Sequence, residues 1–356
     1  MLPDKHVHFR YVLGMKAKII IVVCISLAAI MIGIALGSVY IPPETIFHII
    51  VHKLFGTELP ADIKATTVSI LWDLRLPRTL LAFIVGAALS VSGAVMQSVL
   101  RNPLATPFTL GVSSGASFGA SIVIIYGITI PVLGALSLPF MGFVFGLLTM
   151  LLAIAFASRI DGQMENNTII LVGFVFSLFV NAITTLMVTM EHQHMQRLIF
   201  WQMGSFSMKE WQPVYILVPL VIIGIIFLIR YNRELDIMTF GEEQAKTIGV
   251  NLKSVKWILL SSSAGLTGSA IAFSGVIGFV DLVVPHIVRK LFGSPHKLVI
   301  PMSAVFGGMF LVICDLAART VVSPSELPVG VVTALIGAPF FAYIYFGRGA
   351  KSANTQ

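Results

Sequence analysis

Charged residues are scarce in this chain. They make up 11% of its 356 residues, whereas apolar residues make up 57%, and the mean hydropathy is +0.95. A soluble domain carries about 25% charged residues, so the composition excludes an ordinary soluble enzyme. It predicts an all-α, polytopic membrane protein. The formal net charge of +7 then reports on membrane topology and gives no reason to expect a nucleic-acid partner.

Cysteine and nucleotide-binding motifs are also scarce or absent. Cys24 and Cys314 are the two cysteines and both lie in apolar runs, which argues against a disulfide framework. No G-x-x-x-x-G-K-[ST] phosphate loop occurs, so ATP and Mg²⁺ would have to be used by another subunit. No Ala-x-Ala site ends the first apolar run, so we expect an uncleaved first helix. No metal-ligand spacing is strict, and we expect no metal or cofactor on this chain.

Apolar runs dominate what is present. About 20 residues cross a bilayer as a helix at 1.5 Å per residue. Ten runs can be marked, at roughly 19–40, 79–100, 108–130, 138–157, 168–190, 212–229, 257–274, 276–292, 299–318 and 328–346. Ten crossings place both termini on one side, and 16 of the 23 Lys and Arg residues fall on that side. The positive-inside rule makes it the cytoplasmic side.

The order of these runs predicts the domain organisation. We expect one transmembrane domain over residues 1–356. Its second and seventh helices start on opposite sides, so the blocks 79–190 and 257–346 would have inverted topology, a common plan among transport proteins.

Two segments outside the membrane are long enough to matter. Residues 41–78 are expected outside, with a helix at 43–55. Residues 230–256 are expected inside as two short amphipathic helices, with Gly249 as a stop signal. Within the second segment, two interpretations stay open: a solvated surface, or a helix that docks into a soluble partner. The residues concerned are Glu242, Glu243, Ala245 and Gly249.

A polar break from Asn102 to Leu104 separates the second and third runs, and the proline between them blocks a continuing helix. Gly111, Gly115 and Gly119 then share one helical face, which lets two helices approach closely in lipid. The same stretch matches G-x-S-x-G, the pattern of a serine nucleophile. That nucleophile needs a strand-to-helix turn, so helix packing is the favoured interpretation and an intramembrane protease a distant alternative.

Three outer arginines, Arg75, Arg78 and Arg319, flank predicted helix ends. They either snorkel to the membrane interface or hold an acidic partner by bidentate pairing. Asp315 lies four residues before Arg319, so an i,i+4 ion pair is expected.

Asp281 has no obvious local partner, and a carboxylate in an apolar run is a functional candidate. A cluster of Met and His residues lies at the end of the fifth run and just after it: Met187, Met190, His192, His194 and Met195. They could contact a metal or a metal chelate, although a polar loop with incidental Met and His is the simpler interpretation.

Long motifs bring a resemblance to a known family. LRLPRTLLAFIVGAALSVSGAVMQ, followed by RNPLATPFTLGVSSGASFGA, GEEQAKTIGV and SELPVGVVTALIGAPFF, resembles the FecCD family of ABC importer permeases over nearly the whole chain after about residue 70. The resemblance implies a type II importer fold with ten helices. It also implies a second permease chain, two cytoplasmic ATPases and an external binding protein.

The resemblance also implies roles for individual residues. Arg75, Arg78 and Arg319 would dock the binding protein. Residues of about 236–256, including Glu242, Glu243, Ala245 and Gly249, would couple to the ATPases. The cytoplasmic gate would contain Asn102, Leu104, Asn166, Asn167 and Thr168. Where the family usually has glycine this chain has Asp281, which makes Asp281 a candidate for substrate contact or for pairing with another helix.

The expected function is therefore import of an iron–siderophore complex by a permease in the cytoplasmic membrane of a bacterium. Haem and vitamin B12 are alternative cargoes. An ion-gradient-driven secondary transporter is the alternative from another class, but it would need buried carboxylates on several core helices, and the middles of the predicted helices are nearly free of acids. No covalent chemistry on the substrate is expected.

Overall fold

The computed structural model describes residues 5–37 and 39–353, and their side chains over 14–37, 39–191 and 193–343. Over this part of the chain the regular structure is entirely helical. Among the described residues, seven helices are long and apolar enough to cross a membrane, which confirms a polytopic helical membrane protein. Each of the ten predicted runs overlaps one helix, although α5 (Val112–Tyr126) and α13 (Val280–Phe292) are short.

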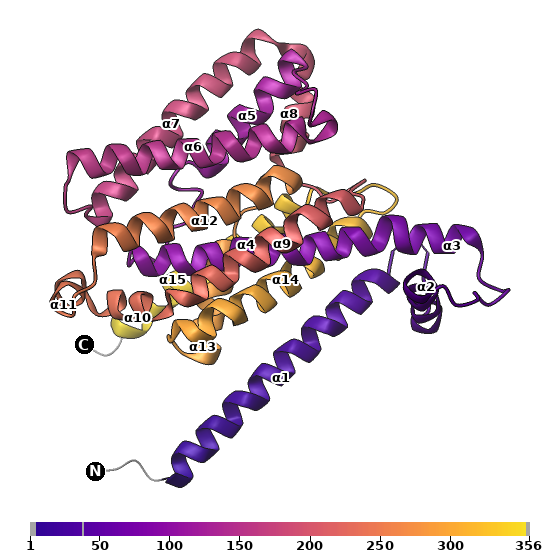
Figure 1. Ribbon diagram of the computed structural model, residues 1–356, viewed down its shortest axis with the longest axis horizontal. Helices are drawn as coiled ribbons and strands as arrows, with labels where there is room; N and C mark the ends of the chain where they lie inside the picture. The colour runs from indigo at the N-terminus through magenta and orange to yellow at the C-terminus, as the bar shows by residue number, and fades with distance from the viewer. Residues whose placement is uncertain (1–4, 38, 354–356) are drawn as a thin grey trace.

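A long central helix organises the fold. Helix α3 (Ala65–Ser69), the π-helical turn η1 (Ile70–Arg75) and α4 (Leu76–Val99) continue into one another without a break. Around them lie α9 (Trp211–Arg230), α12 (Leu252–Ser274), α13 and α14 (His296–Thr320; Figure 1). Most of α4 is buried, because it packs against neighbours on every side.

The second predicted helix began at Thr79, whereas the observed one begins at Ala65. The prediction failed there because Asp73, Arg75 and Arg78 lower the local hydropathy, although η1 and the start of α4 bury apolar side chains such as Leu71. Arg75 and Arg78 therefore lie inside a helix instead of flanking its end.

Glycines set how closely the central helices approach. A Cβ on Gly86 would lie 2.2 Å from the Gly307 carbonyl oxygen of α14 (His296–Thr320). A Cβ on Gly93 would lie 2.0 Å from the carbonyl oxygen of Asp281, in the first turn of α13. Both distances are far inside van der Waals contact, so these backbones touch directly, as small-residue packing in lipid permits.

A second group of helices packs on the other side of α12. It contains α5, α6 (Ser137–Ile160), α7 (Asn166–Met190) and the short α8 (Met195–Gln202), with the 3₁₀ turns η2 (Gly134–Leu136) and η3 (His192–His194) between them (Figure 1). Gly115 and Gly119 of α5 face the backbone of α6. This confirms helix packing as the use of the glycine spacing.

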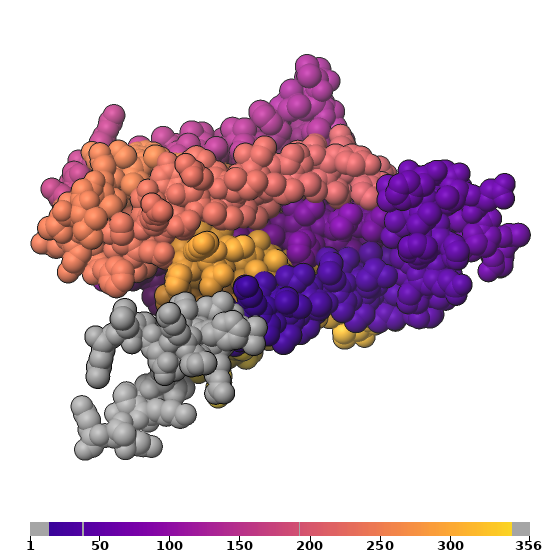
Figure 2. Space-filling model, turned by 60° about the horizontal axis from the view of Figure 1, so that its bottom comes forward, coloured from indigo at the N-terminus to yellow at the C-terminus, as the bar shows by residue number. Residues whose placement is uncertain are grey.

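The two ends of the molecule differ in character. At one end α1 (Lys5–Ala35) meets α2 (Pro43–Phe55), the helix predicted at 43–55, and the segment before α4 forms a compact projection (Figure 2). At the other end lie α10 (Asn232–Phe240) and α11 (Glu242–Thr247), the two short helices predicted in 230–256 (Figure 1). The last helix, α15, spans Val329–Ala353.

Candidate functional site

A basic pocket lies at the end of the molecule near α2. Its cavity of about 320 Å³ is lined by four cationic side chains, Arg75, Arg78, Lys209 and Arg319, and by Glu326. Asp315 lies beneath it and is 1% exposed. The four cations outnumber the two carboxylates, so the pocket is electropositive.

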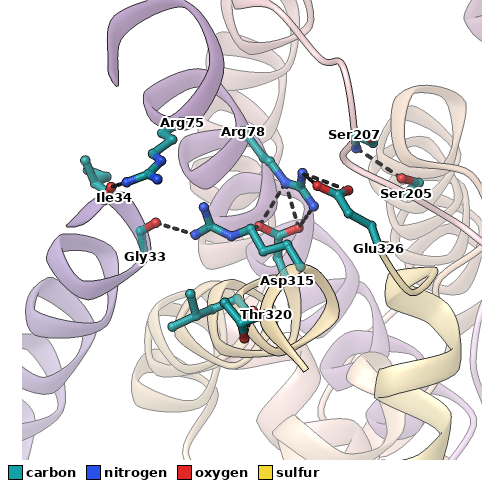
Figure 3. A network of polar contacts seen from close by, with 11 residues as sticks. Gly33, Ile34, Arg75, Arg78, Ser205, Ser207, Asp315, Thr320 and Glu326 are labelled. Carbon is teal, nitrogen blue, oxygen red and sulfur yellow. Dashed lines mark hydrogen bonds and ion pairs between the residues drawn. The ribbon is translucent and has the colours of Figure 1, made fainter. Parts of the chain in front are cut away.

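Arg78 is the centre of this pocket (Figure 3). Its Nη2 and Nε donate to Asp315 Oδ1 over 2.8 and 3.0 Å, and its Nη1 donates to Glu326 Oε1 over 2.9 Å. Arg319 Nε lies 3.5 Å from Asp315 Oδ2, which confirms the predicted i,i+4 pair, and Arg319 also donates to the Gly33 carbonyl. Asp315 therefore pairs with two guanidinium groups at once, and Arg78 meets it with two N–H groups of its planar fork.

Arg75 hydrogen-bonds to the last turn of α1. Its Nη1 donates to the carbonyl oxygens of Ala35 and Ile34 over 2.9 and 3.2 Å. The last carbonyls of a helix have no partner within it, and a cation beside them is favourable. Arg75 thus holds the end of α1 against η1.

Lys209 differs from the three arginines. It lies in the loop between α8 and α9, lines the same cavity, and makes no ion pair with any described residue. Burial lowers the pKa of Lys209. Lys209 was not singled out from the sequence, since a lone lysine in a polar loop carries no signal.

A second cavity, of about 440 Å³, lies at the opposite end of the molecule. Asn102, Asn166 and Asn167 line it together with Glu165 and Glu242. The structure thus brings three of the five predicted gate residues together with a predicted coupling residue. Of the other two, Leu104 is exposed and its backbone N–H donates to Asn102 Oδ1 over 2.9 Å, and Thr168 is half-buried in the first turn of α7.

Lys256 joins α11 to this region. It is fully buried, its Nζ lies 2.8 Å from Glu242 Oε1, and it donates to the Met164 carbonyl over 2.6 Å. Lys246 of α11 also donates to Gln163 Oε1 over 2.9 Å. Helix α11 is therefore fastened to the loop between α6 and α7.

The other predicted coupling residues lie around this attachment. Ala245 is buried, Glu243 is exposed, and Gly249 ends the segment with a φ of +91°. In the adjacent loop, Asp161 accepts the backbone N–H groups of Glu165 and Gln163, which lowers the pKa of Asp161.

The predicted pathway residues lie on two elements. Asp281 begins α13 and is 1% exposed. The Thr106 side chain faces it, but neither carboxylate oxygen has a partner at standard hydrogen-bond geometry among the described residues. Met187 is half-buried and Met190 exposed near the end of α7.

Comparison with known proteins identifies the family. The FecCD transport family matches residues 23–346 of this chain. The chain belongs to the FecCD transport family.

Relatives of this FecCD protein are ABC transporter permeases. It is 42% identical to the uncharacterized ABC transporter permease YvrB of Bacillus subtilis, over 91% of this chain and 92% of YvrB. It is 36% identical to the cobalamin import permease BtuC of Halobacterium salinarum, over 84% of this chain and 79% of BtuC. Other relatives are named for hemin transport, Fe(3+)-citrate import and iron(3+)-hydroxamate import.

A solved structure has the same fold. A metal-chelate type ABC transporter in an inward-facing conformation superposes on this FecCD protein with a TM-score of 0.80 at 27% identity, covering 93% of this chain and 99% of that one. The FecCD protein is thus a transport component of the membrane, not an enzyme.

Proposed function

We propose that this FecCD protein is the permease subunit of a binding-protein-dependent ABC importer for iron–siderophore complexes. The family match over residues 23–346 carries the proposal. The iron-related names of several relatives favour an iron chelate, and haem and cobalamin are the alternative cargoes because other relatives are named for them. An ion-gradient-driven transporter is not favoured by these relatives.

The proposed assembly contains a second permease chain, identical or related, together with two cytoplasmic ATPases and an external binding protein. The ATPases would use ATP and Mg²⁺, since this chain has no phosphate loop. We place the assembly in the cytoplasmic membrane, with ten crossings, eight of them in two inverted four-helix blocks, and both termini inside. The bias of Lys and Arg toward the α10–α11 end supports this orientation.

In the proposed cycle, acidic side chains of the loaded binding protein dock at Arg75, Arg78 and Arg319. The surplus of positive charge in their pocket supports this role. Cargo would enter a cavity between the two permease chains that is lined largely by α7, passing Met187 and Met190, with Asp281 as a further pathway residue.

At the cytoplasmic end, the ATPases would act on the coupling segment 236–256 through Glu242, Glu243, Ala245 and Gly249. The contact of Glu242 with the asparagine-lined cavity supports a link from this segment to the proposed gate at Asn102, Leu104, Asn166, Asn167 and Thr168. Each partner would shift the populations of an outward-open and an inward-open state by preferring one of them.

Reconstitution tests the proposal. The permease and its ATPases are placed in liposomes, and uptake of an Fe(3+)-siderophore, hemin and cobalamin is compared in the presence of the binding protein. We expect uptake of the iron chelate that requires ATP inside and the binding protein outside. Uptake by the isolated chain on a proton or sodium gradient alone would refute the proposal.

A further inference from the structure

A chain of polar side chains, most of them buried, runs from α10 to the first turn of α13. It begins at Asp236 of α10, whose Oδ1 accepts the backbone N–H of His296 over 2.9 Å and lies 2.5 Å from His296 Nδ1. His296 is the first residue of α14, and its side chain is 1% exposed. The first N–H groups of a helix lack partners within it, and a carboxylate there is favourable. Asp236 therefore fixes α10 to the start of α14.

The chain continues into the end of α4. His296 Nε2 lies 2.6 Å from Ser98 Oγ. Arg289 of α13 reaches the same hydroxyl, with Nη2 donating to Ser98 Oγ over 3.0 Å and to the Ala94 carbonyl over 2.9 Å. One serine near the end of α4 thus contacts side chains from α13 and α14.

The last link returns to the start of α13. Arg289 Nη1 donates to Gln97 Oε1 over 2.5 Å, and Gln97 Nε2 donates to the Asp281 carbonyl over 3.1 Å. The orientation of the Gln97 amide is determined by its partners, because an arginine can only donate and a carbonyl can only accept. Gly93 touches the same carbonyl from α4, so the first turn of α13 is held by a hydrogen bond and by direct backbone contact.

We propose that Asp236, His296, Ser98, Arg289 and Gln97, which we name the cytoplasmic polar chain, transmit movement of α10 to the first turn of α13 and so to Asp281. The inference rests on the proposed function, in which partner ATPases move the segment that contains α10. Buried polar groups are costly to leave without partners, so α10 cannot shift unless α14, α4 and α13 follow or bonds break. The five are positioning residues.

The test measures whether the start of α13 responds to nucleotide. A Val276→Cys reporter is placed between α12 and α13, beside a cavity that Gly278 also lines, with the exposed Cys24 replaced by alanine. The transporter assembled with its ATPases is labelled with a maleimide, without nucleotide and after trapping with ATP, Mg²⁺ and vanadate. We expect the labelling rate to differ between the two states in this parent.

Breaking the chain should remove that difference, and it is compared only among variants whose ATPases still co-purify with the permease. Asp236→Ala removes the first link at a half-exposed residue, which limits the risk to folding, and His296→Phe removes the second. Asp236→Asn keeps an oxygen acceptor and should restore the difference. The double variant should lose no more than either single variant, since residues that act as one unit are not additive.

Lys297→Ala is the matched control, because Lys297 is the exposed neighbour of His296; it should keep the nucleotide difference. A parent whose labelling ignores nucleotide, or an Asp236→Ala variant that retains the full difference, would overturn the inference. A parent that binds no ATPase would instead contradict the proposed function.

Discussion

Replacing Asp315 by asparagine should strongly destabilise the outer pocket. Asp315 is 1% exposed and forms ion pairs with both Arg78 and Arg319. After the substitution, Arg78 keeps its ion pair with Glu326, but Arg319 keeps only neutral oxygen acceptors such as the Gly33 carbonyl. Breaking a buried ion pair on one side costs about 3–5 kcal/mol, because it leaves an unpaired buried charge. With an unfolding entropy of about 2.1 cal/mol/K per residue, this corresponds to a fall of roughly 4–7 °C in the apparent Tm of the 356-residue chain.

The measurement is the loss of monodisperse protein on heating in detergent, followed by size-exclusion chromatography. Glu326→Gln is the matched control, since Glu326 contacts the same arginine but its side chain is 38% exposed. Exposed ion pairs contribute about 0–1 kcal/mol, so this variant should stay close to the parent. Adding Arg319→Met to Asp315→Asn should recover part of the loss by removing the unpaired charge. The reasoning is wrong if Asp315→Asn costs no more than Glu326→Gln.

Three further predictions concern other parts of the chain. Lys209→Glu should weaken binding of the loaded external protein, measured by biolayer interferometry, with little change in Tm, because Lys209 has no described ion pair to break; unchanged affinity would exclude it from docking. Glu243→Lys should reduce stimulation of the ATPases without loss of stability. Glu242→Lys should reduce both the stimulation and the stability, because it places a second cation beside buried Lys256. Equal stability of the two variants would contradict this. Gly93→Ala should abolish stable expression, because the added Cβ would overlap the α13 backbone. Gly265→Ala has open space around it and should raise Tm slightly. Both are measured by fluorescence-detected chromatography, and tolerance of Gly93→Ala would disprove the close contact.

Hydropathy located the helices well and their ends less well. Each apolar run overlaps a helix, and the helix predicted at 43–55 has the same bounds as α2. The prediction left residues 65–78 out of the central helix, because a hydropathy average counts Arg75 and Arg78 as polar residues outside the membrane. In the fold their charge is satisfied by α1 carbonyls and by two carboxylates, which no local average can register.

The candidate sites were found only in part. Asn102, Asn166 and Asn167 were predicted together as gate residues, and they line one cavity. The motif resemblance could identify these positions because it does not require knowledge of their contacts. Lys256 and His296 were missed. Each is a single polar residue at the start of an apolar helix, which is a common pattern at membrane interfaces. Only their burial and their pairing with Glu242 and Asp236 distinguish them.

The order of residues was enough to establish a helical membrane protein, its family and the rough position of every helix, because hydrophobic length and motif letters are local properties. Only the tertiary structure determined which charged side chains pair with each other. Arg78 and Asp315 are 237 positions apart, and they pair only because close glycine contacts between α4 and α14 fix how the two helices are rotated and how far each is shifted along the other.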